Sequence, residues 1–146
     1  MTLKKLFLSV NNEMKKRVHL KNMRPIINEY NNIDWKKYVY FDNNKYNRNT
    51  VYKNENIEMV IISWNNNQKS GLHDHPKNGC LMKILDGELN EYIYNEKLNL
   101  LKINNCKKDC ISYQEGKNGI HDIINKNNKT VLLHIYSPPN HDITRY

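Results

Sequence analysis

The sequence predicts a mainly β domain, a sandwich or a small barrel, that is preceded by short helices. Between about residue 46 and residue 139, short runs of β-branched and aromatic residues alternate with polar turns, which is typical of such folds. Before about residue 42, apolar side chains recur at helical spacing instead. A chain of 146 residues has room for one hydrophobic core. We therefore expect a single domain over 1–146, helical at about 1–42 and β-rich at about 46–139.

The N-terminal portion is expected to form three helices. In the first, the apolar side chains at helical spacing are Leu3, Leu6, Phe7 and Val10. The second covers 23–30 and has Pro25 near its start, where proline is tolerated. The third is short and includes Trp35, Tyr38 and Val39, with Asp34 as the expected N-cap.

The β portion is expected to be a series of short strands joined by polar turns. The runs with strand-like composition are 57–64, 81–85, 88–94, 99–103, 110–113, 120–124 and 130–136. Turn residues separate them, as at Asp86-Gly87 and in the glycine-containing segment 116–119. Pro138 and Pro139 end the last strand.

Three histidines stand out as candidate metal ligands. His73 and His75 are one residue apart on an extended segment, so their side chains point to the same side. His121 lies well downstream, in a second segment that begins with glycine. Three imidazoles can hold a first-row metal on one face and leave the opposite face open for chemistry. Two solvated histidines would be a simpler interpretation, but it leaves the flanking glycines and the apolar run after Cys80 unexplained.

Charge and composition argue against several other classes of protein. The net charge is +8, but the lysines are dispersed and no basic run contains glycine and aromatic residues, so we expect no nucleic-acid partner. The apolar stretch at the N-terminus is too short for a secretory leader, and no stretch is long enough to span a membrane. The three cysteines leave at least one thiol unpaired and match no zinc spacing, which favours a reducing, cytoplasmic location. His19 and His141 are expected at the surface.

The order of these motifs resembles the cupin family. The first cupin motif has a glycine, His-x-His, a position usually occupied by glutamate and a closing glycine. Here it runs from His73 and His75 through Cys80 to Gly87. The second motif matches Gly119, His121 and Asn125. With cysteine in place of the glutamate, the chain is most similar to the thiol dioxygenases, and specifically to the cysteine dioxygenase family.

This resemblance extends over most of the chain. Segments 26–30, 35–38 and 41–42 are similar to the N-terminal helices of the family. Tyr46-Asn47-Arg48-Asn49 resembles its substrate-binding Tyr-x-Arg-Asn motif, and Trp64 precedes the histidine pair by the family interval. Segment 133–139 is similar to the family's His-x-Tyr-Ser-Pro-Pro.

The resemblance implies a cupin-type small β-barrel, also called a double-stranded β-helix or jelly roll, with short N-terminal helices. It implies Fe(2+) as the cofactor, with His73, His75 and His121 as the iron ligands. Tyr136 and Cys80 would be joined by a thioether bond, and His134 would support Tyr136. The residues that would hold the substrate carboxylate are Arg48 and Tyr46.

The chemistry of these residues agrees with that resemblance. Three neutral imidazoles leave a ferrous ion its full charge, which favours a substrate that arrives as a thiolate. Arg48 offers a permanently charged planar fork that matches a carboxylate. The expected function is that of a monomeric, iron-dependent cysteine dioxygenase that oxidises the thiol of L-cysteine with O2 to L-cysteine sulfinic acid. Two alternatives stay open, a dioxygenase for another small thiol such as 3-mercaptopropionate and a non-catalytic metal-binding cupin.

Three differences from the family pattern lie close to the expected site. Gly79 stands before Cys80 where animal members typically carry histidine, and Leu132 occupies the place of a serine that orients the histidine corresponding to His134. The family's C-terminal strands do not follow Tyr146, so a more open pocket is expected.

Overall fold

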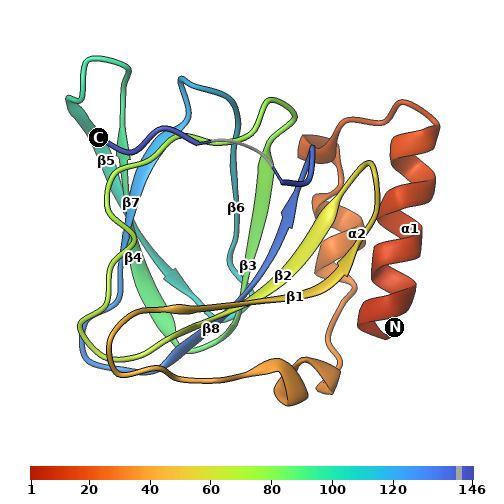
Figure 1. Ribbon diagram of the computed structural model, residues 1–146, viewed down its shortest axis with the longest axis horizontal. Helices are drawn as coiled ribbons and strands as arrows, with labels where there is room; N and C mark the ends of the chain where they lie inside the picture. The colour runs from red at the N-terminus through yellow and green to blue at the C-terminus, as the bar shows by residue number, and fades with distance from the viewer. Residues whose placement is uncertain (141–142) are drawn as a thin grey trace.

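Two antiparallel sheets form the β portion of the chain and face each other across a shared interior in this computed structural model (Figure 1). The five-stranded sheet has the order β1 (Asn47–Lys53), β2 (Glu58–Trp64), β8 (Thr130–Tyr136), β3 (Cys80–Asp86), β6 (Ile111–Gln114). The three-stranded sheet has the order β5 (Leu100–Lys107), β4 (Glu88–Tyr94), β7 (Ile120–Ile124). The structure describes residues 1–140 and 143–146, so the expected surface residue His141 lies outside the described residues.

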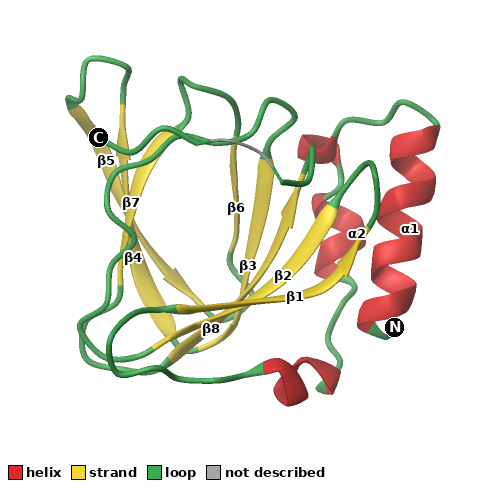
Figure 2. Cartoon of the chain, viewed as in Figure 1, coloured by secondary structure: helices red, strands yellow, loops and turns green. Residues whose placement is uncertain are grey.

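The helices all precede the strands, as the sequence predicted (Figure 2). They are α1 (Leu3–Lys15), the 3-10 helix η1 (Leu20–Asn22), α2 (Arg24–Asn28) and the 3-10 helix η2 (Asp34–Tyr38). Strands β4, β7 and β8 have the expected bounds, whereas β1 was not among the expected strands. No helix among the described residues is long and apolar enough to cross a membrane.

The expected N-cap role of Asp34 in the third helix is wrong. Asp34 is the first residue of η2, whose cap position is Ile33 and which has no side-chain cap. The Asp34 carboxylate instead accepts the backbone N–H of Leu3, 2.8 Å away, at the start of α1, and also the hydroxyl of Tyr30. The carboxylate therefore satisfies a free N–H group of a helix that is distant in sequence.

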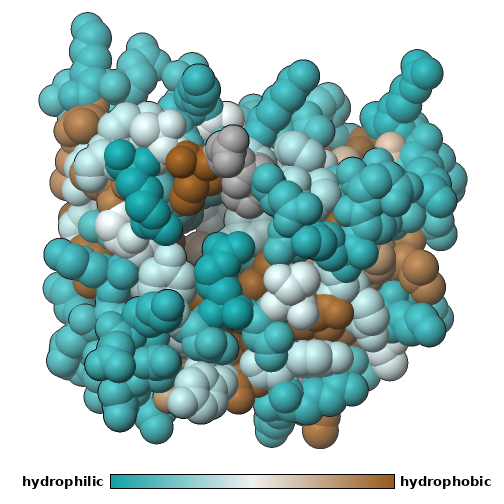
Figure 3. All heavy atoms as spheres, viewed as in Figure 1, coloured by the Kyte–Doolittle hydropathy of each residue, from teal (hydrophilic) through white to brown (hydrophobic). Residues whose placement is uncertain are grey.

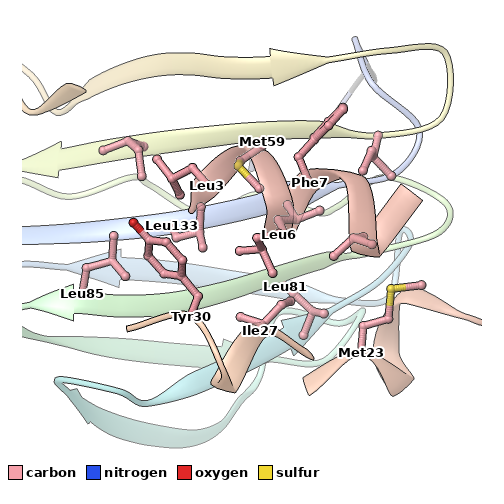
Figure 4. Close-up of a cluster of buried hydrophobic side chains, with 14 of the residues drawn as sticks. Leu3, Leu6, Phe7, Met23, Ile27, Tyr30, Met59, Leu81, Leu85 and Leu133 are labelled. Carbon is pink, nitrogen blue, oxygen red and sulfur yellow. The ribbon is translucent and has the colours of Figure 1, made fainter. Parts of the chain in front are cut away.

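The outer face of the five-stranded sheet carries the helices. Side chains alternate between the two faces of a strand, and one set of alternate residues packs against α1 and α2. Figure 4 shows Leu3, Leu6 and Phe7 of α1 with Ile27 of α2 lying against this face. The sheet residues in the same cluster are Met59, Ile61, Leu81, Leu85, Val131, Leu133 and Ile135. This face holds the main hydrophobic core of the protein.

The inner face of the same sheet lines the space between the two sheets. Its buried side chains form a second cluster with residues of the three-stranded sheet, among them Leu89 and Ile123. The members from the five-stranded sheet are Val60, Ile62, Trp64, Cys80, Met82, Ile84, Leu132 and Tyr136. Cys80 and Tyr136, two of the residues singled out in the sequence, therefore lie along this interior.

Candidate metal centre

The three histidines predicted as ligands come together in the structure. His73 and His75 lie on the segment between β2 and β3, and His121 is the second residue of β7. The Nε2 atom of His121 lies 2.9 Å from Nε2 of His75 and 3.1 Å from Nε2 of His73. His73 and His121 also exchange two backbone hydrogen bonds of 3.1 Å, which align the loop with the strand. The backbone therefore fixes the relative position of these two ligands.

The other ring nitrogen of each histidine faces a hydrogen-bond acceptor. Nδ1 of His73 lies 2.9 Å from the carbonyl oxygen of Gly71, and Nδ1 of His75 contacts the carbonyl oxygen of Gly119. Nδ1 of His121 lies 2.7 Å from Oε2 of Glu91. Each Nδ1 therefore carries the proton, and the three converging Nε2 atoms present lone pairs.

Burial keeps the rings of His73 and His75 neutral. Burial is the largest cause that lowers the pKa of His73 to about 3, and the charges of Arg145 and Arg48 act in the same direction. Burial also holds the pKa of His75 well below its ordinary value. A neutral imidazole is the form that binds a metal ion, so both rings are in the state that a ligand requires.

The separations of the nitrogen atoms fit a metal ion. Around a metal with nitrogen ligands at about 2.1 Å, neighbouring ligands are about 3.0 Å apart in an octahedral arrangement and about 3.4 Å apart in a tetrahedral one. The observed 2.9 and 3.1 Å match the octahedral value. Three protein ligands leave the remaining positions of a metal ion free for other ligands, as a catalytic site requires.

Glu91 belongs to this site but was not singled out in the sequence. It lies on β4, is fully buried, and its second oxygen Oε1 accepts a hydrogen bond of 2.7 Å from the hydroxyl of Ser112. Burial opposes the ionisation of Glu91, but the hydrogen bonds from His121 and Ser112 help to outweigh it, and the pKa of Glu91 lies below its ordinary value. One feature of the sequence could have indicated this residue. Glu91 is a charged residue two positions from the apolar Leu89, so both lie on the same face of the strand.

Asp74, between the two loop histidines, anchors the C-terminal segment. Its carboxylate accepts the backbone N–H of Thr144 at 2.7 Å and the hydroxyl of Tyr146 at 3.3 Å. A backbone bridge also pairs His73 with Arg145. Segment 144–146 therefore lies along the histidine loop, and in Figure 1 the chain runs across this end of the barrel.

The predicted carboxylate-binding residues lie near the same end. The Arg48 guanidinium donates a hydrogen bond of 3.0 Å to the hydroxyl of Tyr136, while part of Arg48 stays exposed. Tyr46 stacks on Trp64, with ring centres 4.4 Å apart, and accepts a hydrogen bond of 3.3 Å from Arg145. A second guanidinium, that of Arg145, which no sequence motif indicated, therefore lies beside Tyr46.

Two cavities adjoin the C-terminal segment, and Figure 3 shows a hollow near the middle of the corresponding face. One, of about 350 Å³, is lined by Arg48, Glu58, Asn140, Ile143 and Arg145. The other, of about 560 Å³, is lined in part by Asp74, His75, Pro138 and Thr144. The first cavity holds both guanidinium groups and is the better candidate for binding an anionic small molecule.

Cys80, His134 and Tyr136 form a hydrogen-bonded group on the inner face. Cys80 on β3 and Tyr136 on β8 are directly opposed in the strand pairing. Nδ1 of His134 lies 3.0 Å from the Tyr136 hydroxyl and 3.4 Å from Sγ of Cys80. Burial raises the pKa of both the Cys80 thiol and the Tyr136 phenol, so each keeps its proton at neutral pH.

The structure shows the surroundings of two of the differences from the family pattern, Gly79 and Leu132. Gly79 has φ +96°, which favours glycine, and a Cβ atom there would overlap the hydroxyl of Tyr113. Tyr113 therefore takes the space into which a larger residue at position 79 would project. Leu132 lies on the same strand face as His134 and offers no hydrogen bond, and Nε2 of His134 has no partner among the described residues.

Known proteins similar in sequence point to one family. The family described as cysteine dioxygenase type I matches residues 4–146. Cysteine dioxygenase type 1 of Danio rerio is 31% identical over 121 residues, covering 73% of this chain and 58% of that protein. The Homo sapiens protein of the same name is 29% identical over 138 residues, covering 84% of this chain and 66% of that protein. The chain thus spans about three fifths of the length of these relatives.

Solved structures confirm the predicted fold class. A Klebsiella pneumoniae protein with a double-stranded β-helix domain has a TM-score of 0.66 and 18% identity, covering 80% of this chain and 97% of that protein. A cupin 2 conserved barrel domain protein from Leptotrichia buccalis has a TM-score of 0.59 and 19% identity, covering 72% of this chain and 47% of that protein. The architecture is a cupin-type double-stranded β-helix with short helices at its N-terminal end.

Proposed function

Because this chain belongs to the cysteine dioxygenase type I family, we propose that it is an iron-dependent thiol dioxygenase whose substrate is L-cysteine. It would add both atoms of O2 to the sulfur and give L-cysteine sulfinic acid. The observation that carries the proposal is the group of three converging imidazoles with no carboxylate among them, together with the charges of Arg48 and Arg145 that act on one of them, His73. A site without an anionic ligand suits a substrate that itself brings the anion, as a thiolate does.

The residues of the chain have distinct roles in this proposal. His73, His75 and His121 would hold Fe(2+), which supplies the binding of the thiolate sulfur and of oxygen. Arg48 would bind the substrate carboxylate through its planar fork. The Tyr136 hydroxyl, oriented by Arg48 and His134, would direct a hydrogen bond at the bound substrate. With the substrate held at both ends, its sulfur is oriented before reaction.

Oxygen consumption tests this function directly. We expect the purified protein, loaded with Fe(2+), to consume one O2 for each L-cysteine sulfinic acid formed, measured with an oxygen electrode and by chromatography. His121→Ala, which removes one imidazole, is the matched inactive control. A wild-type protein that binds iron but consumes no oxygen with any thiol would support the alternative of a non-catalytic metal-binding cupin.

A second substrate, 3-mercaptopropionate, is favoured by the lining of the smaller cavity. Arg48 and Arg145 supply two positive charges there, whereas Glu58 already uses both carboxylate oxygens for hydrogen bonds to Thr50 and to the N–H of Asn140. The cavity is thus better suited to bind a carboxylate than to bind the ammonium group that distinguishes L-cysteine from 3-mercaptopropionate. Comparing kcat/KM for the two thiols decides between them, since a higher value for 3-mercaptopropionate would displace L-cysteine.

We also propose that Cys80 and Tyr136 become joined by a thioether bond during turnover. Their direct opposition on β3 and β8 brings the thiol to the same strand face as the phenol ring. Bond formation removes one hydrogen from sulfur and one from the ring carbon beside the hydroxyl, and the two electrons and two protons pass to O2. The bond would fix the tyrosine side chain without adding new contacts.

Peptide mass spectrometry after turnover is expected to show a Cys80–Tyr136 peptide pair that is lighter by two hydrogens. Cys80→Ser should show only the separate peptides, and the free thiols Cys106 and Cys110 serve as internal controls. Separate peptides alone, after many turnovers of the wild-type protein, would contradict the crosslink while leaving the iron site untouched.

Two further proposals concern the location and the assembly of the protein. All three cysteines are free thiols, which supports a reducing, cytoplasmic location. The substrates in the proposal are a small thiol and O2, and neither a nucleic acid nor a membrane is required. We propose that the protein acts as a monomer, and size-exclusion chromatography with light scattering would test this.

A further inference from the structure

We propose that Glu91 is a positioning residue that holds His121 in place and adds one buried negative charge beside a metal centre whose own ligands are neutral. This inference rests on the proposed metal centre. Its basis is the contact between the carboxylate and the ring nitrogen that faces away from the converging Nε2 atoms, Oε2 to Nδ1 at 2.7 Å. Such partners orient a ligand ring and raise its basicity.

The three ligands differ in the group that their Nδ1 atom contacts. For His73 and His75, Nδ1 contacts a neutral carbonyl oxygen, that of Gly71 and that of Gly119 respectively. Only His121 has a charged partner, and both members of that pair are buried, with exposures of 4% for His121 and 0% for Glu91. Water therefore screens this charge very little, and its effect on the centre is larger than that of a surface carboxylate.

Glu91 is itself held rigidly between the two sheets. On β4 it is opposed to Ile123 of β7, two residues from His121, so Glu91 and His121 are diagonal neighbours on one sheet face. Its Oε1 accepts the hydroxyl of Ser112 on β6, which belongs to the opposite sheet. The carboxylate thus joins the metal-bearing sheet to the sheet that carries Cys80 and Tyr136.

The charge has a predictable effect on a bound metal ion. A negative charge close to the centre favours a cation, and it favours Fe(3+) more than Fe(2+) because the ferric ion carries the larger charge. Glu91 would therefore strengthen metal binding and lower the midpoint potential of the iron. It would supply, through His121, part of the negative charge that a directly bound glutamate would otherwise provide.

Glu91→Gln tests the charge while keeping the size and a hydrogen-bond acceptor. We expect roughly a 10- to 100-fold weaker affinity for Fe(2+) alone, measured anaerobically by equilibrium binding, and a higher Fe(3+)/Fe(2+) midpoint potential. Ser112→Ala is the matched control, since it removes a partner of Glu91 and leaves the charge, and it should shift both quantities much less. Wild-type affinity and potential in Glu91→Gln would overturn the proposal.

Glu91→Asp separates the charge from its position and covers the case in which Glu91→Gln does not fold, as judged by circular dichroism. The shorter side chain keeps the charge but draws it back from Nδ1, so we expect weaker binding with a smaller rise in potential. Unchanged affinity in Glu91→Asp would contradict the positioning role. A wild-type protein that binds no Fe(2+) would overturn the metal centre and this inference together, whereas loss confined to activity would affect only the proposed reaction.

Discussion

Alanine at any one of His73, His75 or His121 is expected to abolish stoichiometric iron binding and all oxygen consumption. Each change leaves two imidazoles, and two neutral ligands are too few to hold a ferrous ion in an open site. The Nε2 atom of His121 lies 2.9 Å from that of His75 and 3.1 Å from that of His73, so the three rings form one ligand group. Metal analysis of the purified variants by mass spectrometry measures the iron content.

His19→Ala is the matched control for these variants. His19 is exposed in the helical N-terminal portion and contributes no atom to the ligand group, so its removal should leave the iron content unchanged. Thermal unfolding of the metal-free variants checks that the buried substitutions have not unfolded the barrel. Full iron occupancy in all three folded ligand variants would refute the assignment of the centre.

The second large effect is expected at Arg48. Arg48→Ala should weaken the use of L-cysteine by about 2 kcal/mol, at the low end of the 2–5 kcal/mol known for truncating a charged partner, because Arg48 is partly exposed. This is roughly a 30-fold loss in kcat/KM. Removal of the guanidinium also frees the Tyr136 hydroxyl from its 3.0 Å hydrogen bond, so kcat should fall as well.

Cysteamine provides the discriminating measurement for Arg48, since it has the thiol and the amine of L-cysteine but no carboxylate. The loss should be several-fold smaller with cysteamine, and Arg48→Lys should recover part of the L-cysteine activity because it restores the charge without the fork. Arg145→Gln should reduce the use of L-cysteine less than Arg48→Ala, since Arg145 contacts Tyr46 and Ser70 at the rim. Equal losses for both thiols in Arg48→Ala would show that Arg48 does not recognise the carboxylate.

Much of the fold could be predicted because most strands have a composition that is itself typical of strands. In β8 and β7, β-branched and apolar residues lie between proline or asparagine boundaries, and both strands have the expected bounds. Strand β1 was missed because Asn47–Lys53 is largely polar, and it is an edge strand whose one partner among the described strands is β2. Its strand conformation comes from the neighbour with which it pairs, and a local pattern does not contain that information.

The site was predictable only where its residues form a local motif. His73, His75 and Cys80 lie within eight positions of one another, and their order carries the resemblance to the family. Glu91 could not be recognised in the same way, because its partner His121 lies 30 residues away and the contact depends on the pairing of β4 with β7. Arg145 reaches the site only through the pairing of the C-terminal segment with the histidine loop.

The two faces of the five-stranded sheet differ in what a substitution on them should change. On β2, β3 and β8, the core residues that pack against the helices have odd numbers, as at Met59, Leu81 and Leu133, whereas those that line the interior have even numbers. Variation at odd positions should therefore act mainly on how much folded protein a cell retains. Variation at even positions should act on both stability and turnover, because these side chains are buried and also line the interior. An engineer can therefore raise the abundance of the protein through the odd positions with little effect on its turnover.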